Sequence, residues 1–341
     1  MFNKTWRLIK MFRTIGTFMP YCIAEKSRYL PGIELILQSR LAMQKNKFRK
    51  IQSAKNGNIL PDISEFFEIR DHVFCQHHAS NNPKFSGEKV ALVAHWDPHG
   101  IVDPYVVHYL KALKNIGYTT ILISAGTVHM SDYLFTAADY VLWRDCPGYD
   151  FTSWKAAFEY YPSLFEAREI LVTNDSIFGP MHPLFIVHEV MDKRRCDFWG
   201  LVCSIERVTH LQSYYIVFRS SSIESEAFKN FFKSVDTTED REETIARYEL
   251  GLTQWLQRNR LIAGAYITPA DMPPWQPVNR GPLQILWRQF LRDLKMPFLK
   301  RDIVTQKYLW LIIKNWKEEV AKTGYPVSLI NDYLQRMDSR L

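Results

Sequence analysis

The sequence Arg168-Glu-Ile-Leu-Val-Thr-Asn-Asp-Ser-Ile-Phe-Gly-Pro-Met-His182 changes from apolar to polar at its middle. The run from Ile170 to Thr173 is short and mostly apolar, as in a strand that is buried on both faces of a sheet. The triplet Asn174-Asp175-Ser176 follows directly. Ligands of open α/β sheets bind outside the carboxyl ends of the strands, so an aspartate here can reach a metal ion or a ribose hydroxyl. The alternative is an Asx turn that only closes the strand.

The segments before this stretch alternate between strand-like and helix-like patterns. Apolar runs at residues 90–94, 118–124 and 138–142 predict three further strands, and residues 102–116 and 153–160 predict helices. Strands joined through helices run parallel, and right-handed crossovers place their carboxyl ends at one edge of a sheet. The pattern therefore predicts an α/β fold with a Rossmann-type, mostly parallel sheet flanked by helices.

Polar residues follow each of the four predicted strands. Asp97 follows the first, Gly126 the second, Arg144 and Asp150 the third, and Asp175 the fourth. Four such positions at one sheet edge indicate a ligand-binding cleft. Neither a glycine-rich dinucleotide fingerprint nor a P-loop follows the first strand, so a nicotinamide or flavin cofactor is not favoured.

The positive charge of the chain is concentrated at its two ends. The 341 residues carry a formal net charge of +7, with 47% hydrophobic and 23% charged residues, as in globular proteins. Residues 1–50 contain eleven Lys or Arg and two Asp or Glu, and residues 273–341 contain twelve and six. We expect a basic helical extension and linker at 1–87, the α/β domain at 88–272, and a basic, aromatic-rich helical extension at 273–341.

The two basic extensions are compatible with two roles. Amphipathic helices rich in Trp, Phe, Lys and Arg lie on anionic membrane surfaces, which predicts peripheral membrane contact, whereas packing on the main domain explains the same pattern. No segment approaches the roughly eighteen uninterrupted apolar residues of a membrane span, and no signal peptide is evident. The charge does not fall in a groove-binding motif, so nucleic-acid binding is not expected.

The cysteine and histidine patterns give limited indications. Five cysteines without a CxxC pair indicate neither a disulfide framework nor a zinc knuckle, and they suit a reducing cytoplasm. His95, Asp97 and His99 alternate at the end of the first strand, so their side chains could share one face around a divalent ion. A metal-dependent hydrolase is therefore one alternative function.

Five motifs carry a resemblance to a known family. They are Ala94-His-Trp-Asp-Pro-His-Gly-Ile-Val-Asp-Pro-Tyr105, Arg144 through Gly148-Tyr-Asp-Phe-Thr-Ser-Trp-Lys155, Val172-Thr-Asn-Asp-Ser-Ile-Phe-Gly-Pro180, Asp197-Phe-Trp-Gly200 and His210-Leu-Gln-Ser-Tyr214. The series resembles the rhamnan synthesis protein F family over roughly residues 88–300, including Pro297-Phe-Leu-Lys-Arg301. Those proteins are bacterial glycosyltransferases of surface-polysaccharide assembly. In that family Arg-x-Asn-x-Gly usually follows the third strand, and here Cys146 replaces the Asn.

The resemblance implies a GT-A-like glycosyltransferase domain that holds a nucleotide-sugar at its strand ends. It implies a rhamnosyltransferase of O-antigen, lipopolysaccharide, capsule or rhamnan biosynthesis. The favoured donor is dTDP-rhamnose, and the acceptor is a glycan or a lipid-linked glycan. Such an enzyme works in the cytoplasm, peripherally on the inner face of the cytoplasmic membrane. A non-catalytic scaffold of an envelope-polysaccharide assembly complex is a further alternative.

The same resemblance implies roles for single residues. Glu249, near the start of a predicted helix, matches the catalytic base of inverting members. The triplet at 174–176 stands where a metal-binding Asp-x-Asp motif is common, so Asp175 is the candidate ligand of Mg²⁺ or Mn²⁺. Arg144 is expected to contact the diphosphate. The donor-binding candidates are Asp97, Gly126, Arg144, Asp150, Asn174 and Asp175. The acceptor-binding candidates are Trp199, His210, Gln212 and Tyr214, although core packing is the stronger interpretation of Trp199 and Tyr214.

Overall fold

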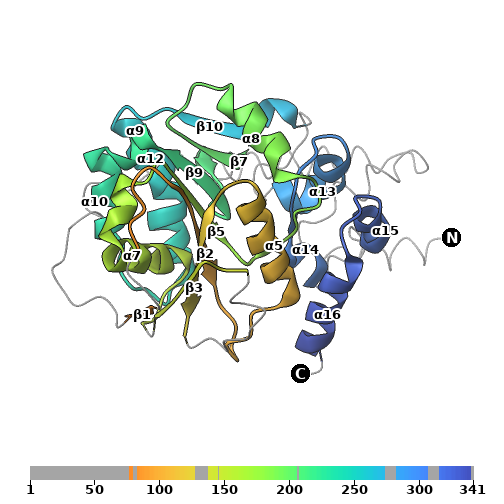
Figure 1. Ribbon diagram of the computed structural model, residues 1–341. Helices are drawn as coiled ribbons and strands as arrows, with labels where there is room; N and C mark the ends of the chain where they lie inside the picture. Colours follow the sequence, from red (N-terminus) through yellow and green to blue (C-terminus); the bar gives the residue numbers. More distant parts are fainter. Residues whose placement is uncertain are drawn as a thin grey trace, which may run out of the picture. The chain divides into compact units, whose positions relative to one another are not determined.

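The structure is a computed structural model that describes residues 77–79, 83–126, 137–144, 146–205, 207–272, 282–305 and 315–338. All of these residues belong to one compact unit. The basic N-terminal extension, with its expected amphipathic helices, lies outside the described residues. The described part is an α/β domain with a mixed, mostly parallel sheet flanked by helices (Figure 1).

The parallel half of the sheet is built around β2 (Lys89–His95). β3 (Thr119–Ala125) and β5 (Glu169–Asn174) lie on either side of β2 and run parallel to it. β4 (Tyr140–Arg144) pairs in parallel with β3, and the short β1 (His77–Ala79) pairs antiparallel with β4. These strands confirm the predicted βαβ arrangement, in which their carboxyl ends share one edge.

The other half of the sheet is mixed. β9 (Tyr215–Arg219) runs antiparallel to β5, and β7 (Phe198–Ser204) runs antiparallel to β9. β10 (Ala263–Ile267) pairs in parallel with β7, and the two-residue β8 (His210–Leu211) pairs antiparallel with β7. The sequence pattern had not predicted β10, because Ala-Gly-Ala-Tyr-Ile carries only a weak strand signal.

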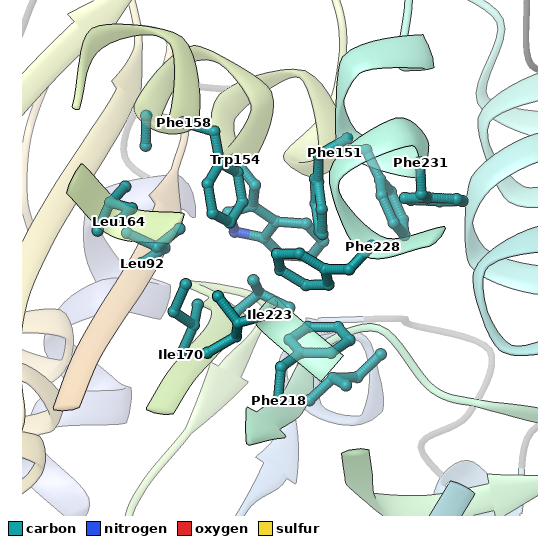
Figure 2. Close-up of a cluster of buried hydrophobic side chains, with 14 of the residues drawn as sticks. Leu92, Phe151, Trp154, Phe158, Leu164, Ile170, Phe218, Ile223, Phe228 and Phe231 are labelled. Atoms are coloured by element: carbon teal, nitrogen blue, oxygen red, sulfur yellow. The ribbon is translucent and has the colours of Figure 1, made fainter. Parts of the chain in front are cut away.

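Period-two alternation distributes the strand side chains between two apolar layers. Every residue of β5 is buried, as expected for a central strand covered on both faces. In β2, Val90, Leu92 and Ala94 face one apolar cluster, which Figure 2 shows with Trp154, Phe158 and Phe228 packed over the strands. Burial of these large side chains stabilises the position of the sheet edge that carries the polar residues.

Helices cover both faces of the sheet (Figure 1). One face is covered by α7 (Asp150–Tyr160), α9 (Ser220–Ile223), α10 (Glu226–Ser234) and α12 (Leu250–Arg258). The other face is covered by α5 (Pro104–Asn115) and α8 (Leu184–Asp192). The shorter helical segments are η2 (Pro162–Glu166), α11 (Arg241–Thr244), the π-helical turn η3 (Ile245–Glu249) and η4 (Pro269–Asp271).

The C-terminal segment is helical, as predicted, and it contacts the sheet domain. Its helices are α13 (Pro282–Arg292), α14 (Arg301–Thr305), α15 (Trp316–Ala321) and α16 (Val327–Asp338), and α16 packs against α5. Between α13 and α14, β11 (Leu299–Lys300) pairs antiparallel with β6 (Ile177–Phe178). The predicted boundaries at 87 and 272 stay a prediction.

Two sequence expectations concern membranes and cysteines. None of the described helices is long and apolar enough to cross a membrane. Cys146 is disulfide-bonded, whereas Cys196 and Cys203 are free. The cysteine spacing gave no indication of this bond, because the fold, and not the spacing in the chain, decides which cysteines meet.

Candidate functional site

An open cleft of about 510 Å³ lies at the carboxyl ends of β2, β3 and β4. The register brings Ser124 beside His95 and Arg144 beside Ala125, so the loops after these three strands meet at one edge. The cleft is lined by Trp96, Ala125, Gly126, Arg144, Cys146, Pro147, Gly148, Tyr149 and Glu239. Two of the predicted donor-binding residues, Gly126 and Arg144, therefore line a cavity large enough for part of a nucleotide-sugar.

Two exposed aromatic side chains in this cleft had not been singled out from the sequence. Trp96 is 59% exposed and Tyr149 is 39% exposed, although large aromatic residues are usually buried. The Tyr149 hydroxyl donates to the carbonyl of Glu239 at 3.0 Å, which orients its ring. Exposed aromatic faces in a cleft are suited to stacking on nucleobases or sugars. The only signal in the sequence was their position directly after a strand and before a helix.

Gly126 allows the chain to turn at the end of β3. Its φ is +97°, a backbone conformation that other residues rarely adopt, and its amide donates to the Arg144 carbonyl at 2.6 Å. A Cβ at this position would meet nothing within 4 Å. Glycine is therefore favoured here by the backbone conformation and not by a lack of space, and the space above the strand end is open.

Arg144 is buried, and its guanidinium holds the loop that forms one wall of the cleft. Nε donates to the Ser153 hydroxyl at 2.9 Å, and Nη2 donates to the carbonyls of Gly148 at 2.8 Å and Tyr149 at 3.2 Å. Nη1 donates to the carbonyls of Cys146 and Pro147. Burial lowers the pKa of Arg144 to about 10, and the nearby Asp150 charge acts in the opposite direction. All five N–H groups thus have protein partners, and the predicted contact with a diphosphate would require some of them to be exchanged.

Asn174 links the end of β5 to the start of α7. Its Nδ2 donates to Asp150 Oδ2 at 2.6 Å, while its Oδ1 accepts from the amide and the hydroxyl of Ser176 at 3.1 and 2.6 Å. The Asx turn that the sequence offered as an alternative is therefore present. Burial, and then the charge of Asp175, raises the pKa of Asp150 to about 6, although Asn174 and Arg144 act against this.

Asp175 is buried and paired with a cation from the C-terminal segment. Its Oδ2 accepts from the Trp96 amide at 3.4 Å and forms an ion pair with Arg301 Nη1 at 3.3 Å. Its main-chain carbonyl accepts from the Tyr105 hydroxyl at 2.9 Å. In the part of the chain that the structure describes, no three His, Cys, Asp or Glu side chains form a group that could hold a metal ion. A lone carboxylate beside a guanidinium does not fit Mg²⁺ or Mn²⁺, which require several oxygen ligands.

Asp97 lies outside the large cleft and is tied to the last helix. Its Oδ1 accepts from the amides of His99 at 2.9 Å and Ile101 at 3.2 Å, and its Oδ2 accepts from Arg336 Nη2 at 2.7 Å. Burial alone would raise the pKa of Asp97, but the hydrogen bonds from Arg336 and from the two amides lower it. Asp97 lines a small cavity together with Asp175 and Arg301, and Trp96 borders both this cavity and the large cleft.

His95 and His99 do not combine with Asp97 into the metal site that the hydrolase alternative requires. The ring of His95 is buried, with Nδ1 at 3.1 Å from the Ser124 hydroxyl and Nε2 at 3.1 Å from the Ile101 carbonyl. Both ring nitrogens of His95 are therefore engaged by the protein. His99 is exposed, and no metal-ligand cluster is found among the described residues.

Glu249 occupies the last position of the π-helical turn that leads into α12. Its side chain is partly buried, and Oε1 accepts from the Ser213 amide at 3.3 Å. Burial, followed by the charge of Glu249, raises the pKa of Tyr214, and Glu249 also contributes to the raised pKa of Asp150. Glu249 therefore lies near both residues. Single π-helical turns within α-helices are frequent at functional sites, because they re-aim a side chain.

The four acceptor-side candidates lie in buried positions. Trp199 is fully buried between His188 and Tyr215, which agrees with core packing. His210 is held by its Nδ1, which donates to the Val208 carbonyl at 2.8 Å. Within the described residues, the buried Gln212 Oε1 and Tyr214 hydroxyl have no hydrogen-bond partner.

The cation near Asp175 is a candidate functional residue that the sequence motifs did not single out. Arg301 ends the Pro297–Arg301 motif, which was noted for its resemblance and not for its charge. Lys300, the preceding residue, lies with its ammonium 5.6 Å from the ring centre of Tyr214. No local pattern in the sequence indicates that either residue would meet the Asn174-Asp175-Ser176 turn.

The fold and the cleft define an α/β protein with its candidate ligand site at the carboxyl ends of parallel strands. The chain belongs to the rhamnan synthesis protein F family, because the model of that family matches residues 120–340. This match covers four of the five motifs on which the resemblance was based and extends through α16. No curated protein matches the chain. Family membership connects the protein with rhamnan and surface-polysaccharide synthesis.

Proposed function

We propose that the protein is a nucleotide-sugar-dependent glycosyltransferase of surface-polysaccharide synthesis, with dTDP-rhamnose as its favoured donor and a glycan or lipid-linked glycan as its acceptor. The observation that carries the proposal is the open aromatic cleft at the strand ends, in a chain of the rhamnan synthesis protein F family. Exposed Trp96 and Tyr149 provide stacking surfaces for the nucleoside. A contact of the basic extensions with the membrane surface belongs to the same proposal, since it would bring a lipid-linked acceptor to the site.

In the proposed reaction, Glu249 is the base. The acceptor hydroxyl attacks the anomeric carbon of the donor, and its proton passes to the Glu249 carboxylate. A new carbon–oxygen bond to the acceptor forms while the bond to the phosphate oxygen breaks, and the electron pair leaves with the nucleoside diphosphate. Within the described residues, the partly buried carboxylate of Glu249 accepts a hydrogen bond only from the Ser213 amide, at Oε1, which leaves Oε2 to approach a hydroxyl group. A positioned base contributes about a hundred- to ten-thousand-fold in rate.

The donor side of the proposed site combines the cleft with the Asn174 turn. Gly126 leaves space for the nucleoside, and the Arg144 side chain fixes the opposite wall at residues 146–149. Asp150, whose pKa is raised by burial and then by the Asp175 charge, and Asp175 itself are candidates for binding sugar and ribose hydroxyls. On the acceptor side, the unpartnered Gln212 and Tyr214 groups are the strongest candidates within the described residues.

The test uses the purified full-length chain with dTDP-rhamnose and a glycan acceptor, and it measures the release of dTDP. Glu249→Gln should reduce the turnover about a hundredfold or more. The control is Glu242→Gln, because Glu242 lies in the adjacent α11 and its side chain is 63% exposed. Both variants should unfold at temperatures close to that of the parent chain. Full activity of Glu249→Gln would remove Glu249 from the mechanism, and failure to bind any nucleotide-sugar would favour a scaffold.

A further inference from the structure

A small two-stranded sheet brings two basic residues to the Asn174-Asp175-Ser176 turn. Directly after the turn, β6 pairs with β11 so that Phe178 lies opposite Leu299 and Ile177 opposite Lys300. The amide of Arg301 donates to the Ser176 carbonyl at 2.8 Å, which continues this pairing into the turn itself. Lys300 and Arg301 are therefore fixed by main-chain hydrogen bonds beside the candidate donor site.

Arg301 contacts Asp175 through one nitrogen of its guanidinium, and its other two nitrogens are available to bind a ligand. Nη1 donates to Asp175 Oδ2 at 3.3 Å and to the Tyr105 hydroxyl at 3.0 Å. Nε and Nη2 make no hydrogen bond to any residue that the structure describes, and the side chain is 24% exposed. Burial alone would lower the pKa of Arg301, but the Asp175 charge together with Tyr105 and Tyr333 outweighs burial and raises the pKa. The guanidinium remains a cation with free donors.

Lys300 supplies a second cation on the side of Glu249. Its ammonium lies 5.6 Å from the ring centre of Tyr214, and the charge of Glu249 reaches the same tyrosine. No carboxylate of the described chain lies within ion-pair distance of Lys300. A partly buried ammonium without a carboxylate partner is costly unless a ligand or water compensates its charge.

These cations lie beside the turn at residues 174–176, where the family resemblance implies a metal-binding Asp-x-Asp motif. Asp175 offers one carboxylate, and that carboxylate is already paired with Arg301. A metal ion bound to Asp175 would stand close to the guanidinium, and the two positive charges would repel each other. Trp96 borders both the large cleft and the small cavity that Arg301 lines, so a ligand in the cleft that extends past Trp96 reaches Arg301.

We propose that Lys300 and Arg301 bind the diphosphate of the nucleotide-sugar in place of a divalent metal, and that the enzyme needs no metal ion for transfer. This inference rests on the proposed function. When the bond between the sugar and the phosphate breaks, its electron pair stays on the phosphate oxygen, and the leaving group gains one negative charge. A guanidinium and an ammonium held beside that oxygen stabilise this charge, as metal ions do in other sites. Arg301 also offers two parallel N–H donors that match phosphate geometry.

The experiment measures the affinity of the full chain for dTDP by calorimetry, once with EDTA and once with Mn²⁺. The parent chain should bind dTDP equally under both conditions. Arg301→Gln and Lys300→Gln should each weaken binding about tenfold or more. Arg301→Lys should restore part of the affinity, because it returns the charge without the planar fork. The control is Lys295→Gln, which removes an equal charge from an exposed residue of the same segment.

The outcomes separate the inference from the proposed function. Binding that disappears in EDTA and returns with Mn²⁺, or Gln variants that bind as tightly as Lys295→Gln, would overturn the inference and leave the glycosyltransferase proposal intact. If the parent chain binds neither dTDP nor dTDP-rhamnose under either condition, the proposed function fails and the inference fails with it. Thermal unfolding of each variant shows whether it is folded. If Arg301→Gln does not fold, Arg301→Lys and Lys300→Gln still test the inference.

Discussion

Arg336, in the last helix of the chain, donates a hydrogen bond to Asp97 at the end of the first central strand, 239 residues earlier. Its Nη2 lies 2.7 Å from Asp97 Oδ2, and the same guanidinium also contacts both oxygens of Asp103. One arginine therefore compensates two buried carboxylates. This contact ties α16 to the turn that begins with Trp96 and so to one border of the candidate site.

Replacement of Arg336 by Gln should destabilise the protein substantially. The variant leaves Asp97 and Asp103 buried beside each other without a cation, and breaking a buried pair in this way costs about 3 kcal/mol. Urea-induced unfolding should give a lower free energy of unfolding for Arg336→Gln. Arg258→Gln, which alters an exposed arginine at the end of α12, should remain within about 0.5 kcal/mol of the parent chain. Equal stabilities of the two variants would show that the ion pairs contribute little.

Asp150 should make the stability of the protein fall as the pH rises through weakly acidic values. Its pKa in the folded chain is raised from 3.8 to about 6, chiefly by burial and then by Asp175. Between these two values the folded state holds a proton that the unfolded state has lost, so the contribution is present below pH 3.8 and is lost as the pH rises through about 6. Asp150→Asn should remove this slope and stabilise the chain at pH 7 by on the order of 2 kcal/mol.

The measurement is a series of urea unfolding curves from pH 4 to pH 7.5, with the parent chain and Asp150→Asn compared at each pH. Asp139→Asn is the contrasting variant, because the pKa of Asp139 is lowered: burial alone would raise it, but the hydrogen bonds from Lys114 and Thr120 outweigh burial. That variant should lose stability at pH 7. Parallel stability curves for the parent chain and Asp150→Asn would contradict the assignment of the raised pKa to Asp150.

The elements that the sequence predicted correctly are those with a strong local pattern. β2 and β5 are runs of buried apolar residues, and α12 has a helical apolar face, so each segment indicates its own conformation. The polar residues after the strands indicated the sheet edge at which the open cleft lies, because the crossover rule depends only on element order. β6 and β11 were missed, since two-residue strands exist only through pairing with a distant partner.

The sequence pointed to the sheet edge where the candidate site lies, but it did not predict the side-chain contacts within that site. Asp175 stays a predicted site residue, but its ion pair with Arg301 joins residues 126 positions apart, and no local pattern encodes such a contact. Arg144 was expected to bind a diphosphate, whereas its buried guanidinium holds the carbonyls of the next loop. An arginine after a strand gives the same sequence pattern whether it binds a ligand or the following loop. Only the path of the residues after it decides which groups its guanidinium contacts.

Removal of the indole ring of Trp96 should weaken nucleotide binding with little effect on stability. The side chain is 59% exposed, so its truncation creates no cavity, whereas an aromatic ring stacked on a base contributes about 1–3 kcal/mol. Trp96→Ala should therefore lower the affinity for dTDP about tenfold or more, and Trp96→Phe should retain most of it. The matched control is Phe185→Ala, which removes a 57% exposed aromatic ring on α8. Equal effects of the two Ala variants would exclude stacking on Trp96.

Gly148 should tolerate substitution much less well than Gly126, although both have a positive φ. Gly126 has a φ of +97° and open space around the Cβ position, so Gly126→Ala costs only backbone strain, about 1 kcal/mol. Gly148 has a φ of +119°, and an added Cβ would collide with the hydroxyl oxygen of Thr152 in α7 and lie 2.9 Å from the Cβ of Thr152. Because the Gly148 carbonyl also accepts from Arg144, a shift of this loop would disturb the cleft wall.

We expect Gly148→Ala to lower the free energy of unfolding by about 3 kcal/mol, since strain and overpacking add. The double variant Gly148→Ala with Thr152→Ala removes the hydroxyl and methyl groups that the new Cβ would meet and should recover part of this loss. It should not recover all of it, because the positive φ of residue 148 and the Cβ of residue 152 remain. If Gly148→Ala and Gly126→Ala lose the same stability in urea unfolding, the collision with Thr152 is relieved elsewhere and the loop at residues 146–149 is less rigid than its hydrogen bonds to Arg144 indicate.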